Sequence, residues 1–102
     1  MRQRQLGLNG PRVSALGLGC LSFGGMFGPT TEAESLRALD AAWEAGITFL
    51  DTANRYGEGV SETVIGTWLR TRGHRPHIAT KAAFSTDPAR RIDNRPEHLK
   101  GE

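Results

Sequence analysis

Asp51, Tyr56 and Lys81 are the three residues whose types and spacing could do chemistry together in this sequence. A free tyrosine has a pKa of about 10, which makes it a weak acid near neutral pH. A lysine ammonium beside a phenol favours the phenolate, and a carboxylate beside the lysine keeps that lysine charged and oriented. A phenol activated in this way could give a proton to a carbonyl oxygen while hydride reaches the carbonyl carbon.

Each of these residues also has an ordinary structural explanation. Asp51 could cap the turn that follows a strand, because aspartate is common at such positions. Tyr56 could be an exposed loop tyrosine, and Lys81 could be a solvated lysine, as most lysines are. The elements that carry the three residues therefore decide whether they can meet.

Apolar runs place Asp51 and Lys81 at the ends of strands. We expect one strand over Ile47–Leu50 that ends at Asp51, and another over His77–Thr80 that ends at Lys81. Tyr56 lies in the polar turn between Thr52 and Gly59. In a parallel barrel the carboxyl ends of the strands share one mouth, where chemistry takes place, so the three side chains could converge.

The N-terminal half predicts a hairpin, a strand and a helix. The turn sequence GLNGP favours a β-hairpin that pairs Arg4–Leu6 with Arg12–Ser14. Ala15–Leu18 is the candidate first buried strand, and a glycine-rich loop follows it. A capping box begins a helix at Thr31, and Gly46 is expected to end it in the left-handed conformation.

A second helix is predicted with Ser61 as its N-cap and Gly73 just past its end. Trp43 and Trp68 fall on the apolar faces of the two helices, where we expect them to pack against the core. The segment Asn94–Glu97 resembles the start of a third helix. The order of hairpin, β, α, β, α, β and the start of an α-helix implies an α/β fold with a parallel sheet.

Composition predicts one soluble globular domain over residues 1–102 and no second domain, since 37% of the 102 residues are hydrophobic and 24% charged. A net charge of +2 from scattered basic residues argues against nucleic acid as a partner. No apolar run approaches the roughly 18 residues of a membrane helix, and no signal peptide is expected. The single cysteine, Cys20, favours a packed thiol and a cytoplasmic location, and the three histidines lack metal-ligand spacing.

The chain resembles the aldo-keto reductases in three segments: GLGCLSFGG, GITFLDTANRYGEGVSE and HIATK. The middle segment matches the family's D-T-A-x-x-Y-G signature through Asp51 and Tyr56, and Ser61-Glu62 after it also fits. Lys81 follows a threonine, as the lysine of the family's third strand does. The resemblance implies a partial (β/α)8 TIM barrel, consisting of the N-terminal hairpin and the first three β/α units.

The resemblance also implies roles for these residues in the NADPH-dependent reduction of an aldehyde or ketone to an alcohol. Tyr56 would be the general acid, Lys81 would tune it and Asp51 would orient Lys81. The nicotinamide of NADPH or NADP+ would lie beside four residues, namely Gly19, Cys20, Leu21 and Asp51. The partner would be a small-molecule carbonyl substrate, and a preference for NADPH over NADH rests on the family alone.

Two parts of the family's site have no match in these 102 residues. The family's histidine follows its fourth strand and its adenosine-phosphate site lies near the last strands, whereas His74, His77 and His98 are not at the matching place. We therefore expect this chain by itself to be inactive, and to be unstable, oligomeric or prone to aggregate. The oligomeric state of a complete protein stays open.

Two other functions fit the same residues. A non-catalytic regulatory or binding subunit could use this fold, because Gly17–Gly25 is similar to the N-terminal motif of the potassium-channel beta subunits. Cys20, Leu21 and Met26 depart from that motif. A truncated remnant of a reductase is the other possibility, and it would carry Asp51 without using it.

Overall fold

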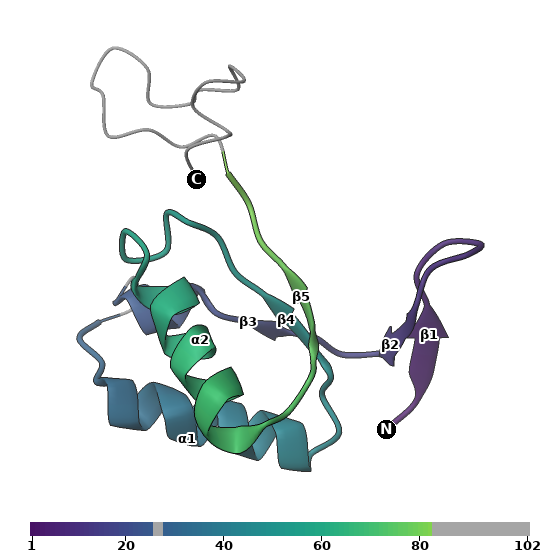
Figure 1. The fold of residues 1–102 in the computed structure, drawn as a ribbon, viewed down its shortest axis with the longest axis horizontal. Coiled ribbons are helices and arrows are strands. Elements are labelled where there is room, and N and C mark those ends of the chain that lie inside the picture. The colour runs from purple at the N-terminus through teal and green to yellow at the C-terminus, as the bar shows by residue number, and fades with distance from the viewer. Residues whose placement is uncertain (26–27, 83–102) are drawn as a thin grey trace.

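Three short parallel strands form the centre of the structure, a computed structural model that describes residues 1–25 and 28–82 (Figure 1). The sheet has the order β3-β4-β5 and is parallel throughout. Its strands are β3 (Leu18–Gly19), β4 (Phe49–Asp51) and β5 (His77–Ala79). The connections are a 3-10 turn, η1 (Leu21–Gly24), and two helices, α1 (Glu32–Glu44) and α2 (Val60–Arg72). An antiparallel hairpin of β1 (Gln3–Gln5) and β2 (Arg12–Ser14) precedes them. The predicted α/β order with a parallel sheet is confirmed.

The first central strand was predicted over Ala15–Leu18, and that position is wrong: β3 begins only at Leu18. The Ser14 hydroxyl donates to the carbonyl of Leu16 and so bends the chain where a strand was expected. Leu16 is consequently exposed rather than buried. Pairing continues past β3, because the N–H of Cys20 donates to the carbonyl of Asp51 over 2.9 Å.

The second strand also starts later than predicted, at Phe49 rather than Ile47. The cause is the end of α1, where the N–H of Ile47 donates to the carbonyl of Ala42 and that of Gly46 to Trp43, both over 3.0 Å. This bond pattern is a Schellman motif, and Gly46 takes the left-handed conformation it requires, with φ 93°. Ile47 is therefore part of the C-terminal cap of α1, and strand β4 begins after it.

The helix starts follow the sequence in one case and depart from it in the other. Thr31 caps α1 as predicted, since its hydroxyl accepts the N–H of Glu34 over 3.2 Å. Ser61 does not cap α2, which is preceded by Gly59 with φ 96° and begins at Val60. Gly73 ends α2 in the left-handed conformation, as expected. The predicted third helix start at Asn94–Glu97 lies outside the described residues.

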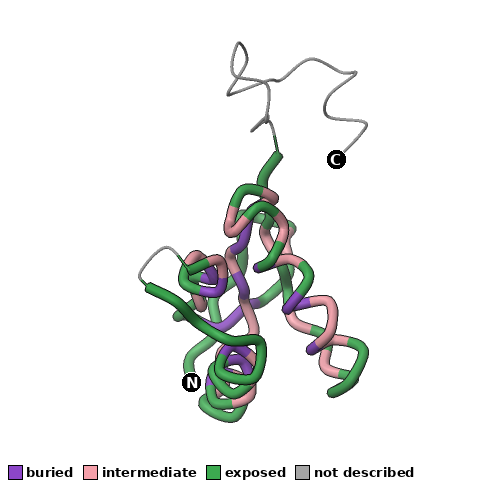
Figure 2. Tube along the Cα trace, turned by 90° about the vertical axis from the view of Figure 1, so that its left-hand side faces the viewer, coloured by how far each residue is buried: buried purple, intermediate pink, exposed green. Residues whose placement is uncertain are grey.

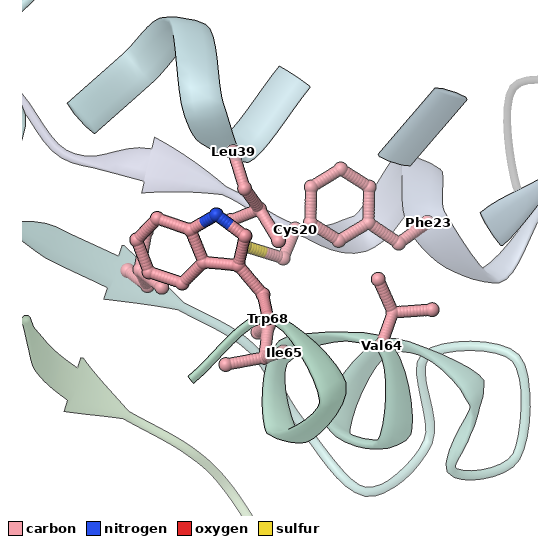
Figure 3. Packing of buried hydrophobic residues seen from close by; sticks show 7 residues of the cluster. Cys20, Phe23, Leu39, Val64, Ile65 and Trp68 are labelled. Carbon is pink, nitrogen blue, oxygen red and sulfur yellow. The ribbon is translucent and has the colours of Figure 1, made fainter. Parts of the chain in front are cut away.

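A cluster of buried apolar side chains joins the two helices to the sheet (Figure 3). Its members are Cys20, Phe23, Leu39, Leu50, Val64, Ile65 and Trp68. Figure 2 shows buried and exposed stretches alternating along both helices, as expected of helices that bury one face. Because side chains alternate along a strand, Leu50 faces this cluster while Asp51 faces the opposite side of the sheet.

Trp68 links the apolar cluster to a polar contact between the helices. Its ring is 1% exposed and lies edge-on to the ring of Trp43, with 5.9 Å between centroids, so both tryptophans pack as predicted. The indole N–H donates to the carboxylate of Asp40 over 2.9 Å, and Arg72 donates to the same carboxylate through two nitrogens. The hydrogen bonds from Arg72, followed by that from Trp68, hold the pKa of Asp40 below its usual value.

Two open edges of the sheet predict the behaviour of the isolated 102-residue chain. Within the described residues, β3 and β5 each pair with β4 alone, and Ile78 of β5 is 41% exposed. Unpaired strand edges are templates for association. We therefore expect light scattering after size exclusion to show oligomers or aggregates. A monodisperse monomer with a sharp thermal transition by circular dichroism would contradict this expectation.

Candidate active site

The ends of the three parallel strands lie at one edge of the sheet and carry the predicted site. In the register of the sheet, Asp51 is opposite Gly19 of β3 and Ala79 of β5. The strands stay aligned past their ends, because the N–H of Thr52 donates to Ala79 over 2.8 Å and that of Asn54 donates to Lys81 over 3.1 Å. The backbone therefore keeps the segment after β4 beside the segment that leads from β5 to Lys81.

Lys81 is the centre of the side-chain contacts at this edge. Its ammonium donates to the carboxylate of Asp51, to the carbonyl of Thr52 over 2.9 Å and to the hydroxyl of Tyr56 over 3.4 Å. Its nitrogen lies 5.2 Å from the centroid of the Tyr56 ring. The structure thus brings together the three residues that the sequence singled out.

The charge on Lys81 is stabilised by these neighbours. The hydrogen bond to Asp51 is the largest cause that raises the pKa of Lys81 above its ordinary value. The side chains of both residues are about half exposed, 45% for Lys81 and 48% for Asp51. An ammonium group therefore stands next to the phenol at neutral pH. Since Lys81 donates to the phenol oxygen, the O–H of Tyr56 is left to donate to a bound molecule.

The loop that carries Tyr56 is held against η1 by a close approach of two glycines. Gly57 has φ 67°, and a side chain on Gly24 would collide with the nitrogen of Gly57 and fall 2.5 Å from the carbonyl carbon of Tyr56. The N–H of Ser61 donates to the carbonyl of Tyr56 over 3.1 Å and fixes the other end of the loop. The glycine contact is a part of the site that the sequence reasoning missed.

The residues at the end of β3 and just after it differ in how far they are exposed at this edge of the sheet. Gly19 lies opposite Asp51 and is exposed, and a side chain built there would meet no atom within 4 Å. Leu21 is half-buried at the start of η1. Cys20 is fully buried in the apolar cluster, and burial raises the pKa of its thiol to about 12. Cys20 is therefore a packed thiol, and its side chain presents no surface to a cofactor.

Across residues 1–25 and 28–82, no three His, Cys, Asp or Glu side chains gather as a metal site would need. In those same ranges, neither helix combines the length and the apolar character that crossing a membrane requires.

Comparison with known protein families assigns the chain to one of them. The model of the aldo/keto reductase family matches residues 15–101. The chain belongs to this family. Its relatives include pyridoxal 4-dehydrogenase of Microbacterium luteolum, 40% identical over 78% of this chain and 23% of that protein. The uncharacterized oxidoreductase YqkF of Bacillus subtilis is 42% identical over 85% of this chain and 27% of that protein.

Solved aldo/keto reductases have the same fold as this chain. The holo form of the aldo-keto reductase AKR11C1 from Bacillus halodurans superposes with a TM-score of 0.80, at 34% identity, over 99% of this chain and 33% of that one. A putative aldo-keto reductase from Pseudomonas aeruginosa gives a TM-score of 0.79 at 32% identity, over 97% of this chain and 37% of that one. This chain thus spans about a quarter to a third of its relatives and corresponds to part of their (β/α)8 barrel, with no closed barrel among the described strands.

The glycine contact predicts a loss of stability on Gly24→Ala in the full-length protein. The added methyl group collides with the backbone of Gly57, and overpacking of this kind costs about 1–3 kcal/mol. Gly66→Ala in α2 is the matched control, because its methyl would meet only the flexible end of Arg70, at 3.4 Å, and alanine favours helix by about 1 kcal/mol. Urea unfolding measures both, and a Gly24→Ala protein as stable as the Gly66→Ala protein would refute the close approach.

Proposed function

We propose that the full-length protein carrying this chain reduces an aldehyde or ketone to an alcohol with NADPH, and that Tyr56 is its general acid. The observation that carries the proposal is the ammonium of Lys81 between the carboxylate of Asp51 and the hydroxyl of Tyr56. Membership of the aldo/keto reductase family supports it. So does the name of one relative, the aldo-keto reductase yakc [NADP(+)] of Schizosaccharomyces pombe, 33% identical over 86% of this chain and 27% of that protein.

We propose that the nicotinamide ring lies at the edge of the sheet beside Gly19 and Asp51. Gly19 is exposed next to Asp51, and the position where a side chain would stand is empty to 4 Å among the described residues. Gly19, Leu21 and Asp51 are the residues that would line the nicotinamide. Bound NADPH would supply the hydride for the carbonyl carbon.

The residues of this chain would supply the proton. The phenol of Tyr56 would donate its hydrogen to the carbonyl oxygen, which becomes the hydroxyl of the alcohol. The Lys81 ammonium, already hydrogen-bonded to the Tyr56 oxygen, would stabilise the negative charge left on that oxygen. Asp51 would hold the ammonium in place and keep it charged, as the raised pKa of Lys81 indicates. A small carbonyl compound in the cytoplasm is the substrate class we propose.

Tyr56→Phe tests this function, because it removes the acidic hydrogen and keeps the ring. We expect kcat for 4-nitrobenzaldehyde, followed by NADPH absorbance, to fall about 10²- to 10⁴-fold, the usual contribution of a general acid. The affinity for NADPH, measured by fluorescence, should stay unchanged. The 102-residue chain assayed alone is the negative control, since it covers only part of the barrel of its relatives.

Two results would overturn the proposal. Undiminished turnover by the Tyr56→Phe protein would remove Tyr56 from the chemistry. A wild-type protein that binds NADPH without turning over any of a panel of aldehydes and ketones would favour a binding or regulatory function on the same fold.

A further inference from the structure

Ser61 joins three segments of the chain beneath the proposed active site. Its side chain is fully buried, and its hydroxyl donates to the carbonyl of Cys20 over 3.0 Å and lies 2.7 Å from the hydroxyl of Thr52. Its own N–H donates to the carbonyl of Tyr56. Since the Ser61 hydrogen is used on Cys20, Thr52 is the donor in the hydroxyl pair. One residue near the start of α2 therefore contacts the ends of β3 and β4 and the loop that carries the phenol.

Glu62, the next residue, contacts the remaining strand end. Its carboxylate accepts a hydrogen bond from the hydroxyl of Thr80 over 2.7 Å. Thr80 directly precedes Lys81, and Thr52 directly follows Asp51. The pair Ser61-Glu62 thus holds the immediate neighbours of both charged residues of the site.

The side chain of Ser61 does not cap α2. The helix is preceded by Gly59, which has a left-handed conformation and makes no side-chain cap. The hydroxyl of Ser61 points instead to the strand ends, where removing it would leave the buried carbonyl of Cys20 without that donor. The Ser61 hydroxyl therefore ties α2 to the strand ends and takes no part in starting the helix.

We propose that Ser61 and Glu62 are positioning residues, which set the distance between Lys81 and Tyr56 by fixing the three strand ends on α2. The inference rests on the proposed reduction for its effect on rate, but the geometry it concerns can be measured without turnover. Neither residue touches the reacting atoms, and both act through the backbone of their neighbours. A displacement of about 1 Å at such a site can cost about 10²-fold in rate.

Ser61→Ala in the full-length protein is the first test, with Ser35→Ala as its matched control. Both serines are buried in helices, but the hydroxyl of Ser35 has no hydrogen-bond partner among the described residues. We expect Ser61→Ala to lower kcat by about 10- to 100-fold while the Kd for NADPH holds, and Ser35→Ala to change neither. Equal kcat for the two variants would overturn the role of Ser61.

Glu62 provides a second pair of variants should Ser61→Ala fail to fold. Glu62→Gln keeps an oxygen that accepts the hydrogen of Thr80, whereas Glu62→Ala removes it. We expect Glu62→Ala to lower kcat and Glu62→Gln to restore most of the loss. Equal rates for Glu62→Ala and Glu62→Gln would overturn the role of Glu62. The amide of glutamine restores the hydrogen-bond acceptor for Thr80 but not the negative charge, so only a role through that hydrogen bond is rescued.

Crystal structures of the same variants separate this inference from the proposed function. The separation of the Lys81 nitrogen from the Tyr56 oxygen, 3.4 Å here, should exceed hydrogen-bonding distance in Ser61→Ala and Glu62→Ala and stay unchanged in Ser35→Ala and Glu62→Gln. Unchanged geometry in all four variants would refute the positioning role even for an active enzyme. The expected displacement in a protein without reductase activity would support the positioning role and refute the proposed function alone.

Discussion

The three-way contact of the Lys81 ammonium with Asp51, Thr52 and Tyr56 is the interaction on which the rest of this account depends. It forms because parallel pairing of β3, β4 and β5 brings strand ends that are far apart in sequence to one edge. Asp51 is the last residue of β4, and Lys81 follows β5 by two residues. A shift of one residue in either strand would turn one of these side chains to the other face of the sheet.

The ion pair cannot itself hold the strands in register. Lys81 and Asp51 are about half exposed, and exposed ion pairs contribute only about 0–1 kcal/mol to stability. Burying a large apolar side chain contributes roughly 1.5–3 kcal/mol, and Leu39, Leu50 and Trp68 are each at most 2% exposed. The apolar cluster therefore fixes the sheet, and the polar edge follows from it. Because successive side chains of β4 point to opposite faces of the sheet, Leu50 faces the helices and Asp51 points away from them.

The features that depend on residues close together in the sequence were predicted correctly from the sequence. The helix α1 with its Thr31 cap, the left-handed Gly46 and Gly73, and the alternation that makes a parallel sheet could all be read from residue types and spacing. So could the meeting of Asp51, Tyr56 and Lys81, once the motif spacing was matched to a family. The start of β3 and the cap of α2 could not, because Ser14 is hydrogen-bonded to Thr48 and Ser61 to Cys20, and both partners are distant in the sequence. The approach of Gly24 to Gly57 joins residues 33 positions apart, and only the glycine-rich composition of the first loop hinted at it.

A double-mutant cycle on kcat with Asp51→Asn and Lys81→Met tests most directly whether Asp51 acts through the Lys81 ammonium. The full-length protein would be assayed at saturating NADPH, so that any weakened binding of the cofactor does not enter the comparison. We expect the double variant to be no slower than Lys81→Met alone, because Asp51 has nothing left to orient. Losses that simply multiply in the double variant would show that the two residues act independently, and would contradict it.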